Sequence, residues 1–232
     1  MSRQFRTLVA HFFGRFFDVD STSTDVDTRA RVIQFLALLT VPGLMISFFM
    51  LADHPANSVW VRAASSQADR LWLRVGDRYV FVAYAMVVMG LLMTFKWDSL
   101  FPDRRDYLIL TSLPISYRRW FAAKLLALGA FLSLFIVAIN VFSLLLVPRQ
   151  VAEQSNVNSP TVFWEALAAH AAGTIGGSLF AALFFGALQG LLINVLTPDA
   201  FRRISPRIQM IAIAALVIAL LLIPLVLSLI HI

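Results

Sequence analysis

The stretch KWDSLFPDRRDYLILTSLPISYRRWFAAK, from Lys96 to Lys124, is a polar interruption between two strongly apolar segments. A charged side chain at the centre of a bilayer costs about 2.5–3.5 kcal/mol, so this stretch must lie in water or against another protein. The sequence therefore predicts a loop that joins two membrane-spanning helices outside the lipid. Its basic residues are Lys96, Arg104, Arg105, Arg118, Arg119 and Lys124.

The composition of the whole chain supports this prediction. The 232 residues are 59% hydrophobic and their mean hydropathy is +0.80, whereas soluble domains are about half apolar. Several apolar runs reach about 20 residues, the length that crosses about 30 Å of hydrocarbon. The sequence predicts an all-α, polytopic transmembrane helix bundle. Since it contains no cysteine, it has no disulfide framework and no thiolate site.

Five apolar segments within residues 32–232 are predicted to form the transmembrane domain. The apolar character of the fourth segment lasts from Val162 to Leu196, or about 52 Å as one helix, which exceeds the bilayer core. We therefore expect a lead-in from Val162 to His170 before the span itself. The predicted spans are about 32–51, 79–95, 121–147, 171–196 and 208–230, with the loop at 96–120.

Residues 1–31 are predicted to form an amphipathic connecting helix followed by a linker. Apolar side chains that include Phe5, Phe12 and Phe16 recur at helical spacing between residues 3 and 17, with arginines interspersed. This pattern is typical of an interfacial helix lying along the membrane. A disordered basic tail is the alternative, although it would leave these apolar side chains in water.

The distribution of charge predicts the orientation of the bundle. The side that holds the N-terminus and residues 96–120 carries 14 of the 19 basic and 8 of the 13 acidic residues, and the other side is neutral overall. The positive-inside rule places the positive side in the cytoplasm, so we expect a multi-pass inner (plasma) membrane protein with a cytoplasmic N-terminus. Because topology accounts for the whole net charge of +6, no nucleic-acid partner is expected.

The last residues, 227–232, read LSLIHI. One frame of a transposase end that is common in sequencing libraries encodes the same letters. We expect adapter read-through and a truncated frame that lacks at least one further span; a natural apolar terminus is the alternative.

The centre of the polar stretch has the features of a short helix with defined ends. Pro102 suits the first turn of a helix, and Asp103 and Asp106 place negative charge near the helix N-terminus. Pro114 ends the helix, and Ser116 is a suitable N-cap for the next one. Two short helices joined at a fixed angle would form a stiff knob that transmits displacement from a docked partner.

Residues 97–116, WDSLFPDRRDYLILTSLPIS, together with the lysine of FAAK, resemble the first cytoplasmic loop of ABC-2 type permeases of ABC exporters. In that family a Leu-Pro-Ile/Val-Ser/Arg element precedes a helix with an early lysine. The sequence also resembles, more narrowly, a bacterial group in which WD, LFPDRRDY and LPI recur. The resemblance covers about Trp72 to Leu128, and the rest of the chain matches only in hydropathy.

The resemblance implies a permease subunit that couples ATP hydrolysis by a separate ABC ATPase to export across the lipid bilayer. It also implies a second transmembrane domain and about six spans, one more than the sequence shows. The chain has no Gly-x-x-x-x-Gly-Lys-Ser/Thr loop, so ATP and magnesium are expected on the partner and no cofactor on this chain. The residues expected to contact the ATPase are Pro102, Asp103, Arg104, Arg105, Asp106, Tyr107, Leu110 and Pro114.

Two other function classes were weighed. An intramembrane enzyme would need a nucleophile and base in contact, but Ser178 and His170 are eight residues apart, or about 12 Å along one helix. No catalytic or metal site is therefore expected. A non-transporting membrane scaffold remains the other alternative.

Polar residues within the spans are candidates for a substrate pathway. Asn140, His170 and Gln189 are the three we select, because polar and ionisable groups in spans normally avoid lipid. A simple interhelical hydrogen bond is the other interpretation of each. Small residues spaced by four positions, such as Gly173 and Gly177, predict close helix packing.

Overall fold

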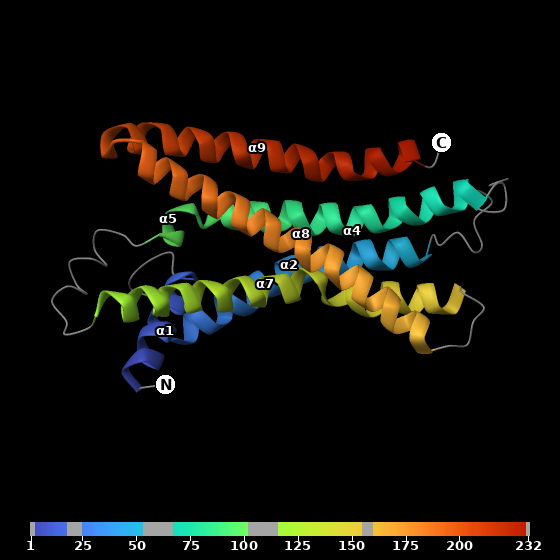
Figure 1. Cartoon of the computed structure of the whole chain (residues 1–232), viewed down its shortest axis with the longest axis horizontal. Helices are drawn as coiled ribbons and strands as arrows, with labels where there is room; N and C mark the ends of the chain where they lie inside the picture. The colour runs from blue at the N-terminus through green and yellow to red at the C-terminus, as the bar shows by residue number, and fades with distance from the viewer. Residues whose placement is uncertain (1–2, 18–24, 53–66, 102–115, 155–159, 231–232) are drawn as a thin grey trace.

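The computed structural model describes residues 3–17, 25–52, 67–101, 116–154 and 160–230. These segments are almost entirely helical and contain no strand, which confirms the all-α prediction. Figure 1 shows the long helices running roughly side by side along the long axis of the molecule. The helices are α1 (Arg3–Arg15), α2 (Asp25–Ala52), α4 (Gln67–Phe95), α5 (Trp97–Leu100), α7 (Tyr117–Gln154), α8 (Pro160–Val195) and α9 (Pro198–Ile230).

Four of these helices, α4, α7, α8 and α9, are long and apolar enough to cross a membrane. The predicted first span coincides with α2, whose apolar stretch is shorter, Val32–Phe48. Helix α2 continues through Pro42 without ending there. The candidate spans in the four long helices are Arg78–Phe95, Tyr117–Ala152, Pro160–Val195 and Pro198–Ile223.

The predicted lead-in at 162–170 and the span predicted after it lie in one continuous helix, because α8 runs unbroken from Pro160 to Val195. It contains no proline after its first residue, and its glycines pack against α4 or remain helical, so nothing interrupts its backbone hydrogen bonds. A helix of 36 residues is about 54 Å long. It therefore exceeds the bilayer core and must tilt or project from it.

Helix α8 crosses both α4 and α7 (Figure 1). A Cβ atom added to Gly177 would lie 2.9 Å from Met86 Cγ, and one added to Gly173 would lie 3.2 Å from Val82 Cγ2. The two glycines thus allow α8 to approach α4 closely. The predicted use of these small residues in helix packing is confirmed.

The remaining helices pack mainly on one partner each. Helices α1 and α2 lie against α7, and α9 lies against α4. At Gly43 of α2, an added Cβ would lie 2.9 Å from the carbonyl oxygen of Ile139 in α7, so these two backbones are nearly in contact.

One end of the bundle collects several helix termini, and we call it the loop end. It holds α1, the passage from α4 into α5, the start of α7 and the start of α9 (Figure 1). Most of the described basic residues that the charge analysis places on the predicted cytoplasmic side belong to these elements, while Arg29 and Arg31 lie in α2. The alternation of chain direction thus agrees with the order of loops predicted from the sequence.

Candidate functional site

The residues predicted to contact an ATPase all lie outside the described residues. They are Pro102, Asp103, Arg104, Arg105, Asp106, Tyr107, Leu110 and Pro114. The chain on both sides of this loop is described, up to Phe101 and from Ser116 onward. The contacts that hold these two flanks therefore show how the loop is attached to the bundle.

On the α4 side, Trp97 is held by hydrogen bonds to two other helices. Its side chain is fully buried, with 0% of its surface exposed. Its indole Nε1 donates to Ser205 Oγ of α9 at 2.8 Å, and its carbonyl oxygen accepts a hydrogen bond from Gln189 Nε2 of α8. Both partners are themselves buried, so these polar groups are paired with one another away from water.

Two further contacts reinforce this arrangement. Gln209 Nε2 of α9 donates to the carbonyl oxygen of Thr94 at 3.0 Å, one turn before Trp97. The ring of Phe101 lies against Gly190 of α8, where an added Cβ would be 3.2 Å from Phe101 Cζ. We refer to the contacts of Thr94, Trp97 and Phe101 with Gln189, Gly190, Ser205 and Gln209 as the Trp97 clamp.

On the α7 side, the start of the helix is held by aromatic packing. Phe16 and Phe17, directly after α1, pack against Phe131 of α7 with ring centroids 4.8 and 5.5 Å apart, and Phe17 also stacks on Phe135 at 6.0 Å. All four rings are fully buried. Together with Phe12 they form what we call the aromatic anchor.

The lysine of the FAAK sequence belongs to the same surface. Lys124 is buried, and its Nζ lies 5.6 Å from the ring centroid of Phe12, a distance at which a cation is attracted to an aromatic face. Trp120 also lies against Phe12, with ring centroids 6.5 Å apart. Instead of presenting an open apolar face, α1 therefore turns its aromatic side chains toward α7.

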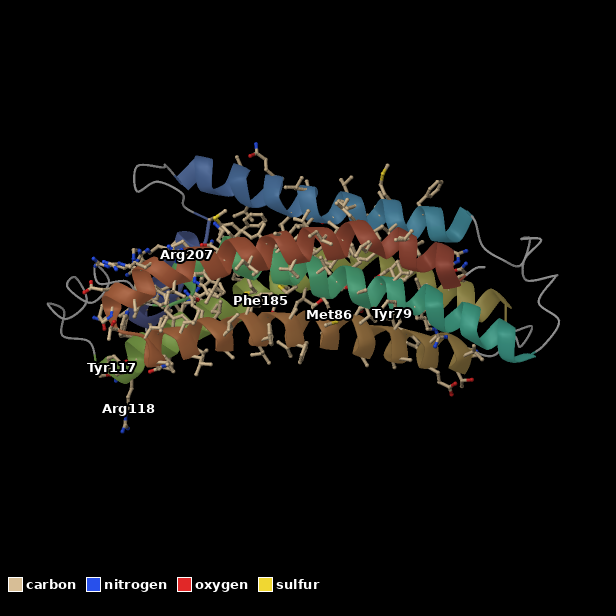
Figure 2. All side chains as sticks on the ribbon, turned by 90° about the horizontal axis from the view of Figure 1, so that it is seen from above. Tyr79, Met86, Tyr117, Arg118, Phe185 and Arg207 are labelled. Carbon is tan, nitrogen blue, oxygen red and sulfur yellow. The ribbon has the colours of Figure 1, made fainter. Side chains whose placement is uncertain are left out.

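Exposed arginines surround these two flanks at the loop end. Figure 2 shows Tyr117, Arg118 and Arg207 at the same end of the molecule. Basic side chains gathered in this way attract acidic partners and anionic surfaces. The exposed arginines of α1, α7 and α9 near this end are Arg3, Arg6, Arg118, Arg119, Arg202, Arg203 and Arg207.

The N-cap predicted at Ser116 is consistent with the backbone. Helix α7 begins at Tyr117, and the carbonyl oxygen of Ser116 accepts hydrogen bonds from the backbone N–H groups of Arg119 and Trp120. Ser116 thus occupies the position at which the first backbone hydrogen bonds of the helix originate.

The three predicted pathway residues are buried but do not form one site. Asn140 Nδ2 donates to Ser178 Oγ at 3.3 Å and to its own helix at Ile136. The His170 ring meets Phe81 edge-on, 5.5 Å away. His170 and Gln189 lie on the buried face of α8 but are 19 residues apart, about 28 Å along the helix.

Two of these side chains carry atoms without a hydrogen-bond partner among the described residues, namely His170 Nε2 and Gln189 Oε1. Such buried, unpaired atoms cost stability and require an explanation. The described residues contain no group of three or more His, Cys, Asp or Glu that could hold a metal ion. Ser178 Oγ donates to the carbonyl oxygen of Thr174 within α8.

Sequence reasoning missed Ser205, Gln209 and the clamping role of Trp97. A usable signal was present, because Ser205 and Gln209 are four residues apart and so share one face of a helix. Two polar residues at that spacing near the start of an apolar helix suggest a hydrogen-bonded contact. Their partners, however, are 108 residues away for Ser205 and 115 residues away for Gln209. The sequence gives no indication of that pairing.

No protein-family model matches this sequence, and neither a curated protein nor a solved structure is significantly similar to it. The argument for function therefore depends on the chain itself.

Proposed function

We propose that this chain is the membrane-spanning permease subunit of an ATP-driven exporter of the ABC-2 type. It would lie in the inner membrane with its N-terminus in the cytoplasm and pair with a second transmembrane domain. A separate ATPase subunit would bind ATP and magnesium and dock on residues 96–120.

The observation that carries the proposal is the way both flanks of the loop are fixed in the bundle. The Trp97 clamp holds one flank to α8 and α9. On the other flank, Phe12 packs beside Trp120 and Lys124 near the start of α7, and the rest of the aromatic anchor packs farther along the first half of that helix. A loop held at both ends passes a push from a docked partner to the long helices, whereas a loosely tethered loop would absorb it.

The exposed arginines provide a second line of support. A basic surface beside the loop would complement acidic residues on a partner and accelerate its docking. The same positive charges satisfy the topology rule for a cytoplasmic face. Charge alone therefore does not separate a docking surface from an ordinary cytoplasmic loop, and the experiment must do so.

The test is recovery of an ATPase with the tagged chain from the membranes of its source cells. Reversing charge with Arg104→Glu and Arg105→Glu should lower the recovered ATPase about tenfold or more, as for other central interface charges. The matched control reverses two exposed arginines of the opposite predicted face, Arg78→Glu and Arg149→Glu, and should retain the ATPase. Equal recovery from both variants would remove the loop from the docking surface.

A non-transporting scaffold is the second candidate, and one contact favours it. The Asn140 side chain is occupied by hydrogen bonds to Ile136 and Ser178, which is what a residue used only for helix packing would do. Absence of any ATPase from the purified unmutated chain would favour the scaffold. The membrane location would be unchanged in that case.

A further inference from the structure

The helices of this bundle fall into two groups according to their main contacts. Helices α1 and α2 pack on α7, whereas α9 packs on α4, and α4 passes almost directly into α5. Helix α8 touches both groups, since it lies against α4 on one side and α7 on the other. The loop at 102–115 connects α5 of one group to α7 of the other.

The side-chain hydrogen bonds at the loop end are not shared equally between the groups. Three described bonds cross between helices there, from Trp97 to Ser205, from Gln189 to Trp97 and from Gln209 to Thr94. All three join the α4–α5 segment to α8 or α9. From the α1–α2–α7 group to α4 or α8, the described side-chain hydrogen bonds are those of Asn140 with Ser178 and of the Tyr84 hydroxyl with the carbonyl oxygen of Leu39 in α2, both longer at 3.3 Å.

We propose that Trp97 is a positioning residue that makes α4, α5, α8 and α9 move as one rigid unit against the α1–α2–α7 group. The proposed function supplies only the source of the displacement, which is the ATPase docked on the loop. The push enters α5, and the Trp97 clamp carries it to α8 and α9 as well as to α4. The sliding surface between the two units is then mainly the α7–α8 contact, with the smaller contacts of α4 with α7 and α2 beside it.

The chemistry of the clamp explains why Trp97 suits this role. Its indole binds α9 and its backbone carbonyl binds α8, so one residue fixes two helices at once. Both bonds are buried, and opening either one exposes an unpaired polar group to an apolar interior. These bonds therefore oppose the separation of α5 from both α8 and α9. An aliphatic residue in place of Trp97 would oppose it only through the apolar area that it buries.

The cysteine-free sequence allows a direct test, because any introduced cysteine pair is unique. Spin labels at Phe95 of α4 and Arg203 of α9, both exposed, report distances within the unit. Labels at Leu126 of α7 and Val195 of α8, also exposed, report distances between the units. Both distance distributions are measured on the full chain in lipid nanodiscs.

In the first measurement, Trp97→Phe keeps the aromatic ring and removes the indole donor, and Ser205→Ala removes the acceptor. Each variant should raise the population with a separated Phe95–Arg203 pair about tenfold. The double variant should add little, because both changes break the same bond. Ser205→Thr, which keeps the hydroxyl, should restore the parent distribution.

Two matched controls exclude a general loss of folding. Trp164→Phe changes a tryptophan of α8 that is 64% exposed. Ser47→Ala changes a buried serine whose hydroxyl donates only to Gly43 of its own helix. Both should leave the Phe95–Arg203 distribution unchanged. An unchanged distribution in Trp97→Phe and in Ser205→Ala would overturn the rigid unit.

The second measurement adds the co-purified ATPase with ATP and magnesium. The Leu126–Val195 distance should change while the Phe95–Arg203 distance stays constant, and in Trp97→Phe the second distance should change too. A parent chain in which both distances change together would overturn the proposal. If no ATPase is recovered, the proposed function fails, and the first measurement still decides whether the unit exists.

Discussion

The aromatic anchor and the Trp97 clamp hold the two flanks of the same loop by different means. In the anchor, Phe16 and Phe17 lie against Phe131, a contact of ring on ring with no directional requirement beyond shape. In the clamp, each bond joins one donor to one acceptor on a different helix. The rings of the anchor are buried, and so are Thr94, Trp97, Gln189 and Ser205 of the clamp, so at these residues the difference lies in the interaction and not in access to solvent.

This difference predicts different responses to load. The free energy gained from aromatic packing is roughly proportional to the buried area. Helix α1 can therefore shift on α7 and still retain most of that stabilisation. Hydrogen bonds weaken steeply with distance and angle, so the clamp either holds its register or opens. The anchor therefore stabilises the helix that leaves the loop, while the clamp fixes the position of the helix that enters it.

The largest expected effect comes from removing a ring of the anchor. Phe16→Ala deletes a fully buried ring that stacks on Phe131 and should weaken docking of α1 by about 3 kcal/mol. Trypsin should then cleave after the arginines of α1 in reconstituted protein, a site that the docked helix protects. The control is Phe180→Ala, since that ring is 60% exposed on α8; equal cleavage of the two variants would contradict the anchor.

A buried charge in the clamp should have the next largest effect. Gln189→Glu replaces the amide donor with a carboxylate facing the Trp97 carbonyl oxygen, which should lower stability by about 2 kcal/mol. The change in melting temperature is measured by heating the protein in detergent and monitoring its unfolding by size-exclusion chromatography. Gln4→Glu on the exposed side of α1 makes the same chemical change in water, and its melting temperature should equal that of the parent.

The cation in the anchor should contribute less. Lys124→Met keeps the length of the side chain but removes the charge that lies over the Phe12 ring, with an expected loss of about 1 kcal/mol. Lys124→Arg keeps a cation and should retain most of the stability. The same melting measurement compares the two variants, and identical melting temperatures for Met and Arg would show that the charge over Phe12 contributes nothing.

The sequence predicted the helices well because their signal is local. Apolar runs, Pro42 and Ser116 each act through neighbours within a few residues, and the structure agrees at all of these positions. Small residues spaced four positions apart also identified the face of α8 that packs against α4. The boundary between lead-in and span in α8 is not set by hydropathy, because a hydropathy pattern does not limit how far a helix extends beyond the lipid.

The candidate site was much less predictable. The bonds of the Trp97 clamp join residues 92 to 115 positions apart in the chain, and no spacing rule reaches that far. Gln189 illustrates the difficulty, since a polar residue in a span signals a partner without naming it. The sequence suggested that Gln189 lines a substrate pathway. In the structure, the amide nitrogen of Gln189 donates a hydrogen bond to the backbone carbonyl oxygen of Trp97.

The smallest expected effect is the one that compares the two helix groups most directly. Asn140 and Ser178 join α7 to α8, and interhelical bonds of this kind contribute about 0.6 kcal/mol in membrane proteins. A double-mutant cycle with Asn140→Leu and Ser178→Ala, read from unfolding in mixed micelles, should give a coupling of that size. The same cycle on Trp97→Phe and Ser205→Ala should give a larger coupling. If the coupling at Asn140–Ser178 equals or exceeds the coupling at the clamp, the α7–α8 contact is as firmly bonded as the Trp97 clamp. The distinction between a sliding surface and a rigid unit would then disappear.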